Sequence, residues 1–84
     1  MGSKERLIKK FISRKSITVE DCHNLLTIYG YSLHKSSGSH RSYHKKGDTP
    51  ITVIIPKNTR YIKPGYIDKI IKKLNLEDYH EENH

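Results

Sequence analysis

The sequence predicts a small α+β domain in which two helices pack on one face of a three-stranded antiparallel sheet, with a further helix in front. Three observations lead to this fold class. Apolar residues recur at helical spacing before Gly30 and again after Pro64, whereas the segment from Tyr31 to Ile55 alternates or is β-branched. Glycines and prolines separate these patterns. The expected order is therefore helix, helix, three strands, helix.

The first helical segment is expected over residues 4–15, where Leu7, Ile8 and Phe11 recur at helical spacing. A second helix should begin after Thr18, because Thr18 and Asp21 form a capping-box pattern that satisfies free backbone amides. Gly30 is expected to end this helix. Its predicted buried face consists of Val19, Cys22, Leu25, Leu26 and Tyr29.

The three strands should be joined by turns at Ser37-Gly38 and at residues 46–49. If Leu33 and Tyr43 oppose each other and face the core, Ser36 pairs with His40 around a three-residue loop. Gly38 then supplies the positive φ that such a loop favours. This register predicts a set of polar side chains on the face away from the core: His34, Ser36, His40, Ser42 and His44.

The third strand should end at Pro56, and Pro64 suits the first turn of the last helix. That helix has an apolar stripe of Ile67, Ile70, Ile71 and Leu74. The acidic segment 77–84 has no such stripe and is expected to be mobile. We therefore expect one domain over residues 1–84, with a helical extension at 4–15, a core at 18–76 and an acidic tail at 77–84.

The 84 residues are 33% hydrophobic and lack tryptophan, so the core is expected to be thin. The net charge is +7, and because four acidic residues lie in the tail, residues 1–76 carry an excess of +11. Such an excess indicates a polyanionic partner, most commonly nucleic acid, although a solvated lysine face kept for solubility would look the same. The single cysteine, Cys22, excludes an internal disulfide, and no segment is long enough to span a membrane. A soluble, cytoplasmic protein is expected.

His40 is the strongest candidate for chemistry. RNA carries its own nucleophile, the 2′-hydroxyl, so a ribonuclease needs a group that exchanges a proton near pH 7 and cations that hold the phosphate. The alternative is an exposed histidine without function in a hairpin. His34 and His44 are weaker candidates of the same kind. A zinc site from the three histidines is not expected, because no carboxylate or thiolate is near them.

The order of elements and these residues together resemble a known family. The features that carry the resemblance are Leu25-Leu26, Gly30-Tyr31, Gly38-Ser39-His40, the β-branched strand ending at Pro56, and Lys63-Pro64-Gly65 at the start of an Ile-rich helix. From Leu25 to Leu76 the chain resembles the HicA family of mRNA interferase toxins from HicAB toxin-antitoxin systems. The resemblance implies a double-stranded-RNA-binding-domain-like fold, which agrees with the order read from the residues.

The resemblance also implies that His40 is the catalytic histidine, that messenger RNA is cleaved independently of the ribosome, and that a HicB-type antitoxin covers the site. No metal or other cofactor is expected, because a slow ribonuclease needs only proton transfer and cations that hold the phosphate. The chain departs from the family in one respect. Where many relatives have a basic residue and then histidine after the strand-ending proline, this chain has Lys57 and Asn58, and asparagine cannot transfer protons.

The residues expected to bind RNA are Ser39, Arg41, Lys45, Lys57, Arg60 and Lys63, of which Arg41 could also point to the opposite face from His40. Tyr61 and Tyr66 are candidates for stacking on bases, whereas Tyr31 and Tyr43 are expected in the core. The rival function is a non-catalytic double-stranded-RNA-binding module of the same fold. DNA binding is less favoured, because no recognition-helix pattern is present.

Overall fold

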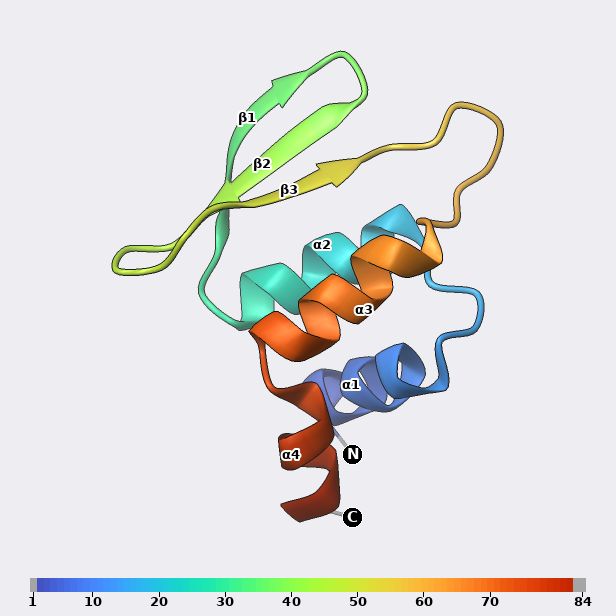
Figure 1. The fold of residues 1–84 in the computed structure, drawn as a ribbon, viewed down its shortest axis with the longest axis vertical. Coiled ribbons are helices and arrows are strands. Elements are labelled where there is room, and N and C mark those ends of the chain that lie inside the picture. The colour runs from blue at the N-terminus through green and yellow to red at the C-terminus, as the bar shows by residue number, and fades with distance from the viewer. Residues whose placement is uncertain (1, 83–84) are drawn as a thin grey trace.

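The computed structural model describes residues 2–82. Its elements are α1 (Ser3–Ser13), α2 (Val19–Ile28), β1 (Ser32–Ser37), β2 (His40–His44), β3 (Ile51–Ile54), α3 (Pro64–Lys73) and α4 (Leu76–Glu82). Figure 1 shows α2 and α3 on one face of the sheet, with α1 on the far side of this helix pair. Helix α1 contacts α2, α3 and α4. The predicted order of helices and strands is confirmed, and α4 is an addition to it.

The core fills the space between the sheet and the helices. Every helix and strand except β1 contributes residues to the core, and so do the connecting segments. The members are Leu7, Ile8, Phe11, Ile17, Cys22, Leu25, Leu26, Tyr31, Tyr43, Ile51, Val53, Ile62, Ile67, Ile70, Ile71 and Leu76. Tyr31 and Tyr43 are buried, as the sequence predicts. Burial raises the pKa of the Cys22 thiol to about 12, so this cysteine is a packing residue rather than a nucleophile.

The N-terminus of α2 has the predicted capping box. The Asp21 amide donates to the Thr18 hydroxyl at 3.0 Å, and the Thr18 amide donates to the Asp21 carboxylate at 3.1 Å. Lys10 from α1 adds an ion pair with Asp21 at 2.7 Å. Two free amides are satisfied in this way, and α1 is tied to the start of α2.

The sheet has the order β1-β2-β3 with both pairs antiparallel. The predicted register holds for Leu33 opposite Tyr43, but the expected place of Leu33 in the core is wrong, because its side chain is 41% exposed. The register is also wrong nearer the turn, where Ser37 pairs with His40. The register shifts at His34, between Leu33 and Lys35, so β1 has one residue more than its partner in this stretch. The loop is therefore a two-residue turn, Gly38-Ser39, in place of the expected three-residue loop. Gly38 has the expected positive φ, +58°.

The acidic segment is the other correction to the expected structure. We expected no helix after Leu76, because the segment has no apolar stripe, but Leu76–Glu82 form α4, in which Leu76 is fully buried and Tyr79 packs against the core. The Lys4 ammonium lies 4.9 Å from the ring centroids of both Tyr29 and Tyr79, so cation–π contacts also attach α4 to α1 and α2. The mobility of the tail and the division into extension, core and tail stay predictions, and residues 83–84 lie outside the described part.

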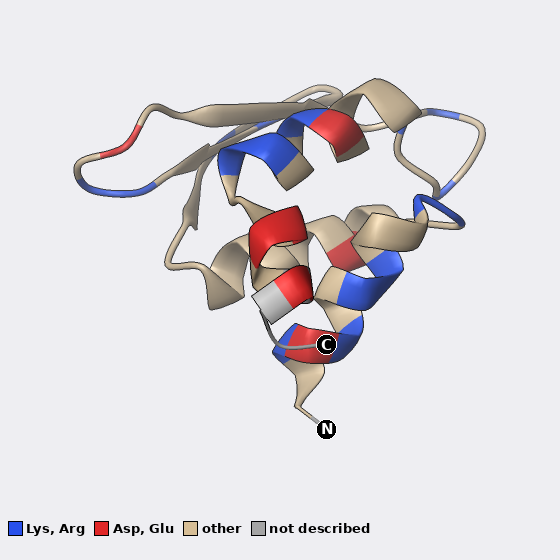
Figure 2. Ribbon diagram, turned by 60° about the horizontal axis from the view of Figure 1, so that its bottom comes forward, with Lys and Arg blue, Asp and Glu red and all other residues tan. Residues whose placement is uncertain are grey.

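The α2-β1-β2-β3-α3 core, with both helices on one face of an antiparallel sheet, is the double-stranded-RNA-binding-domain-like arrangement that the sequence predicts. Figure 2 shows the sheet as a layer above the helices and places several acidic residues on α4. Within residues 2–82, none of the helices is long and apolar enough to cross a membrane.

Candidate functional site

His40 lies at the first position of β2, directly after the Gly38-Ser39 turn, and its side chain is exposed. The Ile55 amide donates a hydrogen bond to the Ser39 carbonyl at 2.6 Å, which fixes the end of β3 against this turn. Lys57 follows two residues later. An open hollow of about 640 Å³ results, lined by Ser36, Ser37, Gly38, Ser39, His40, Arg41, Ile55, Pro56 and Lys57. We call it the His40 hollow.

The face of the sheet away from the helices carries most of the predicted polar set. His40, Ser42 and His44 alternate along β2 with Tyr43, which is buried, so the first three share the outer face. The His34 ring joins them by stacking on His44, with centroids 4.1 Å apart. Ser42 Oγ lies 3.0 Å from His44 Nε2.

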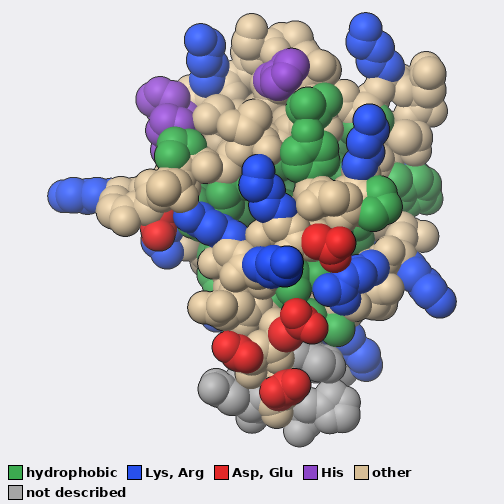
Figure 3. All heavy atoms as spheres, in the orientation of Figure 1, with side chains coloured by type: hydrophobic (Ala, Val, Ile, Leu, Met, Phe, Trp, Pro, Cys, Tyr) green, Lys and Arg blue, Asp and Glu red, His purple; other side chains and the backbone are tan. Residues whose placement is uncertain are grey.

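The expected position of Ser36 on that outer face is wrong. Because of the register shift at His34, Ser36 pairs with Arg41, and opposed residues lie on the same face of a sheet. Arg41 in turn lies opposite Val53, which is buried, so the pair faces the helix side. The histidines gather over the strands in Figure 3, whereas most acidic side chains lie toward α4.

Arg41 therefore follows His40 in the chain but points to the other face of the sheet, as the strand alternation allowed. Its positive charge opposes the effect of burial on the Cys22 thiol pKa, which agrees with a guanidinium close to α2. A second hollow, of about 600 Å³, lies on this side. It is lined by Thr18, Val19, Glu20, His23, Leu33, Arg41 and Arg60, and we call it the Arg41 hollow.

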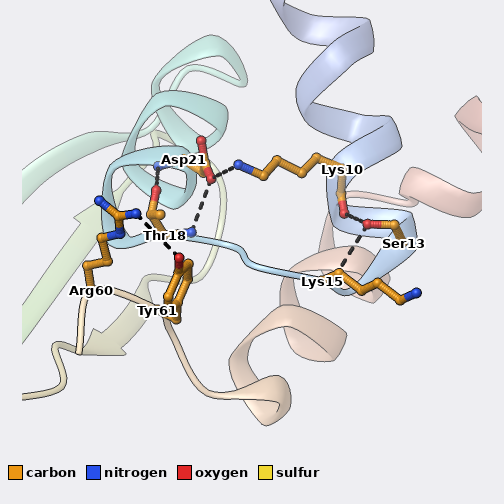
Figure 4. A network of polar contacts seen from close by, with 7 residues as sticks. All are labelled: Lys10, Ser13, Lys15, Thr18, Asp21, Arg60 and Tyr61. Carbon is orange, nitrogen blue, oxygen red and sulfur yellow. Dashed lines mark hydrogen bonds and ion pairs between the residues drawn. The ribbon is translucent and has the colours of Figure 1, made fainter. Parts of the chain in front are cut away.

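The segment between β3 and α3 is held against the start of α2. The Val19 amide donates to the Arg60 carbonyl and the Ile62 amide to the Ile17 carbonyl, both at 2.9 Å, and Thr18 forms a β-bridge with Tyr61. Figure 4 shows Arg60 and Tyr61 beside the capping box of Thr18 and Asp21. The fold thus brings Arg60 to the Arg41 hollow.

The predicted RNA-binding residues are therefore divided among four places, and Arg41 lines two of them. Ser39 and Lys57 line the His40 hollow, and Arg60 lines the Arg41 hollow. Lys45 follows the far end of β2, where its ammonium lies 5.6 Å from the ring centroid of Tyr31. Lys63 occupies the N-cap position of α3, where its side chain makes no capping hydrogen bond, and it lines neither hollow. Of the two stacking candidates, Tyr61 is exposed and Tyr66 is half-buried.

Sequence reasoning missed His23. Its Nδ1 lies 3.0 Å from the Tyr43 hydroxyl, and the residue also lines the Arg41 hollow. The signal was its spacing four residues after Val19, which places it at the edge of the helix face that meets the sheet. Within residues 2–82, no three histidine, cysteine or acidic side chains are grouped so that they could hold a metal ion.

The fold is double-stranded-RNA-binding-domain-like and basic, and it presents an exposed histidine at a tight turn with cations beside it. These features are typical of a small protein that binds nucleic acid. The protein-family model described as "HicA toxin of bacterial toxin-antitoxin" matches residues 19–76. The chain belongs to this family of toxins, which are generally mRNA-cleaving ribonucleases and which act with a cognate antitoxin. The curated proteins and the solved structures gave no significant match.

Proposed function

We propose that this protein is an endoribonuclease toxin that cleaves messenger RNA without a metal ion, with His40 as its catalytic residue. The observation that carries the proposal is the position of His40. It is exposed at the Gly38-Ser39 turn and lines one hollow together with Ser39 and Lys57. Histidine is the side chain whose ordinary pKa suits proton exchange near pH 7. Membership in a family of toxins that generally cleave messenger RNA supports the proposed substrate class.

The chemistry requires one proton to leave and another to arrive. The 2′-oxygen attacks the adjacent phosphorus and loses its proton, and the bond from phosphorus to the 5′-oxygen breaks as that oxygen gains a proton. A 2′,3′-cyclic phosphate and a 5′-hydroxyl result. His40 either takes the first proton or gives the second, and such assistance contributes about 10² to 10⁴ in rate.

Lys57 and Ser39 are placed to stabilise the negative charge that develops on the phosphate oxygens in the transition state. Lys57 is exposed beside Pro56, and it makes no ion pair within the described residues. A cation and a hydroxyl donor placed there stabilise the pentacoordinate phosphorus more than the ground state. Many relatives have histidine where this chain has Asn58, and asparagine cannot transfer protons. His40 therefore transfers one of the two protons, and solvent water transfers the other.

A HicB-type antitoxin is the expected inhibitor. The first 76 residues carry an excess of +11, so an antitoxin that covers the His40 hollow should present acidic side chains to it. Covering the hollow would exclude RNA by steric contact and by charge.

The test compares two oligonucleotides of one sequence, one with ribose throughout and one with every 2′-hydroxyl methylated. The proposal predicts cleavage of the ribose strand only, with 2′,3′-cyclic phosphate ends. Cleavage of the methylated strand would contradict it, because no 2′-hydroxyl is then free to attack. If both strands are bound and neither is cut, the protein is an RNA-binding module without catalytic activity.

A further inference from the structure

The Arg41 hollow contains two cationic side chains that lack an anionic partner. Arg41 is half-buried, and within residues 2–82 its guanidinium has neither a hydrogen bond nor an ion pair. The Arg60 guanidinium donates to the Tyr61 hydroxyl at 3.4 Å and lies 5.4 Å from the centroid of that ring. A guanidinium has five N–H donors, so most of the donors on both residues remain available.

The start of α2 does not supply the anion-binding capacity of this hollow. The amides of Thr18 and Asp21 are used in the capping box, and the Val19 amide donates to the Arg60 carbonyl. Glu20 lines the hollow but forms no ion pair with either arginine. Three of the amides at this helix end are thus occupied, and the two guanidinium groups supply the positive charge that would hold an anion here.

The hollow also offers surfaces for a base. Leu33 is exposed to 41%, which is unusual for a leucine on the helix side of a sheet. The His23 ring lies in the same hollow, held by its hydrogen bond to Tyr43. An apolar side chain and an aromatic ring beside two guanidinium groups match a nucleotide, whose base is flat and whose phosphate is anionic.

Arg41 connects this hollow to the candidate catalytic site, because it lines both hollows and follows His40 directly in β2. We propose that the Arg41 hollow is a second RNA subsite, in which Arg41 and Arg60 bind the phosphate of a nucleotide close along the strand to the one at His40. This inference rests on the proposed function. Because β2 is the central strand, it implies that the RNA passes from the outer face to the helix side around the end of the sheet at the Gly38-Ser39 turn.

The test measures binding of two methylated, non-cleavable oligonucleotides, two and ten nucleotides long, by NMR titration. The proteins are the parent, Arg41→Gln, Arg60→Gln and the control Arg6→Gln, which removes an exposed arginine from α1. We expect the two hollow variants to bind the longer strand roughly tenfold more weakly than the parent, since each loses charge-assisted hydrogen bonds. With the dinucleotide, which fills only the subsite at His40, Arg60→Gln should match the parent, because Arg60 lines the Arg41 hollow alone, whereas Arg41→Gln should weaken binding of both lengths, because Arg41 lines both hollows.

The inference is overturned if Arg60→Gln weakens binding of both lengths equally, or if Arg6→Gln loses as much affinity as the hollow variants. Weaker binding of polyglutamate with unchanged RNA binding would also overturn it, and would make the hollow a site for an acidic protein. Arg41→Lys keeps the charge and should recover part of the affinity, which separates ligand binding from a folding defect. Cleavage of ribose RNA is scored in parallel, so that loss of the subsite and loss of the proposed function give different results.

Discussion

Ile54 lies directly opposite His40 in the antiparallel pair of β2 and β3, and both side chains are exposed on the outer face of the sheet. Ile54 is 37% exposed, so a large apolar side chain lies at the surface beside the candidate catalytic histidine. Because Ile54 carries no charge, it does not repel a phosphate that is bound by the cations around the hollow. The charge at position 54 should therefore have a strong effect on RNA cleavage.

Ile54→Glu places a carboxylate next to the bound phosphate. Two like charges a few ångströms apart repel by about 1–4 kcal/mol near a protein surface, so cleavage should fall at least about fivefold. Thr52→Glu is the matched variant. Thr52 lies two residues before Ile54 in β3, is exposed on the same outer face, and is opposite Ser42 instead of His40. Its loss should be clearly smaller. Equal losses in steady-state cleavage assays would place the reacting phosphate elsewhere on the sheet.

Gly38→Ala should destabilise the turn that carries His40. Gly38 has a φ of +58°, and a Cβ added there meets nothing within 4 Å, so the cost comes from the backbone alone. We expect the free energy of unfolding to fall by about 1 kcal/mol in urea titrations. Gly38→Asn should cost less, because asparagine tolerates this conformation. An alanine variant as stable as the parent would show that the turn adopts another geometry.

Thr18→Ala removes one half of the capping box. The loss of its hydrogen bond to the Asp21 amide should lower the free energy of unfolding by about 1 kcal/mol. Thr27→Ala is the control, since Thr27 lies inside α2 and its hydroxyl donates a hydrogen bond to the His23 carbonyl of the same helix. That change should stay within about 0.5 kcal/mol of the parent. Similar losses in both variants would argue against the cap.

Stability should decrease at acid pH partly through Asp21. Burial raises the pKa of its carboxyl, but the hydrogen bonds from Lys10 and Thr18 outweigh burial, and the pKa lies below its ordinary value of 3.8. A carboxyl with a lowered pKa stabilises the fold above its unfolded pKa and loses this effect as the pH falls through the folded pKa.

The unfolding free energy of the parent should therefore decline as the pH falls below about 4, and the decline should be shallower in Asp21→Asn. Glu5→Gln, on the exposed surface of α1, serves as the control and should follow the parent. An Asp21→Asn variant with the parent's full acid sensitivity would contradict the role of this carboxylate.

Features with local causes could be predicted from the sequence. The capping box of Thr18 and Asp21, the left-handed Gly38 and the start of α3 at Pro64 each depend on residues within one turn of the chain. For the same reason, the placement of His40 at a hairpin turn was predictable. The family match over residues 19–76 confirms the resemblance noted in the sequence.

Features that depend on distant contacts could not be predicted in this way. The register shift at His34 follows no sequence rule, and it is accompanied by the stacking of His34 on His44. Helix α4 lacks an apolar stripe, yet its Leu76 and Tyr79 reach the core and Lys4 contacts the Tyr79 ring. The Arg41 hollow forms because the segment before α3 lies against the start of α2. That contact joins residues far apart in the sequence, so only the tertiary structure reveals it.

The central claim is that His40 catalyses cleavage of RNA without a metal ion. The most direct measurement incubates a long single-stranded RNA in excess EDTA with the parent, with a His40→Ala variant of matching circular dichroism and melting, and with His80→Ala as the same substitution in α4. We predict fragments from the parent and from His80→Ala, and intact RNA with His40→Ala. Equal fragmentation by His40→Ala and the parent would contradict the account.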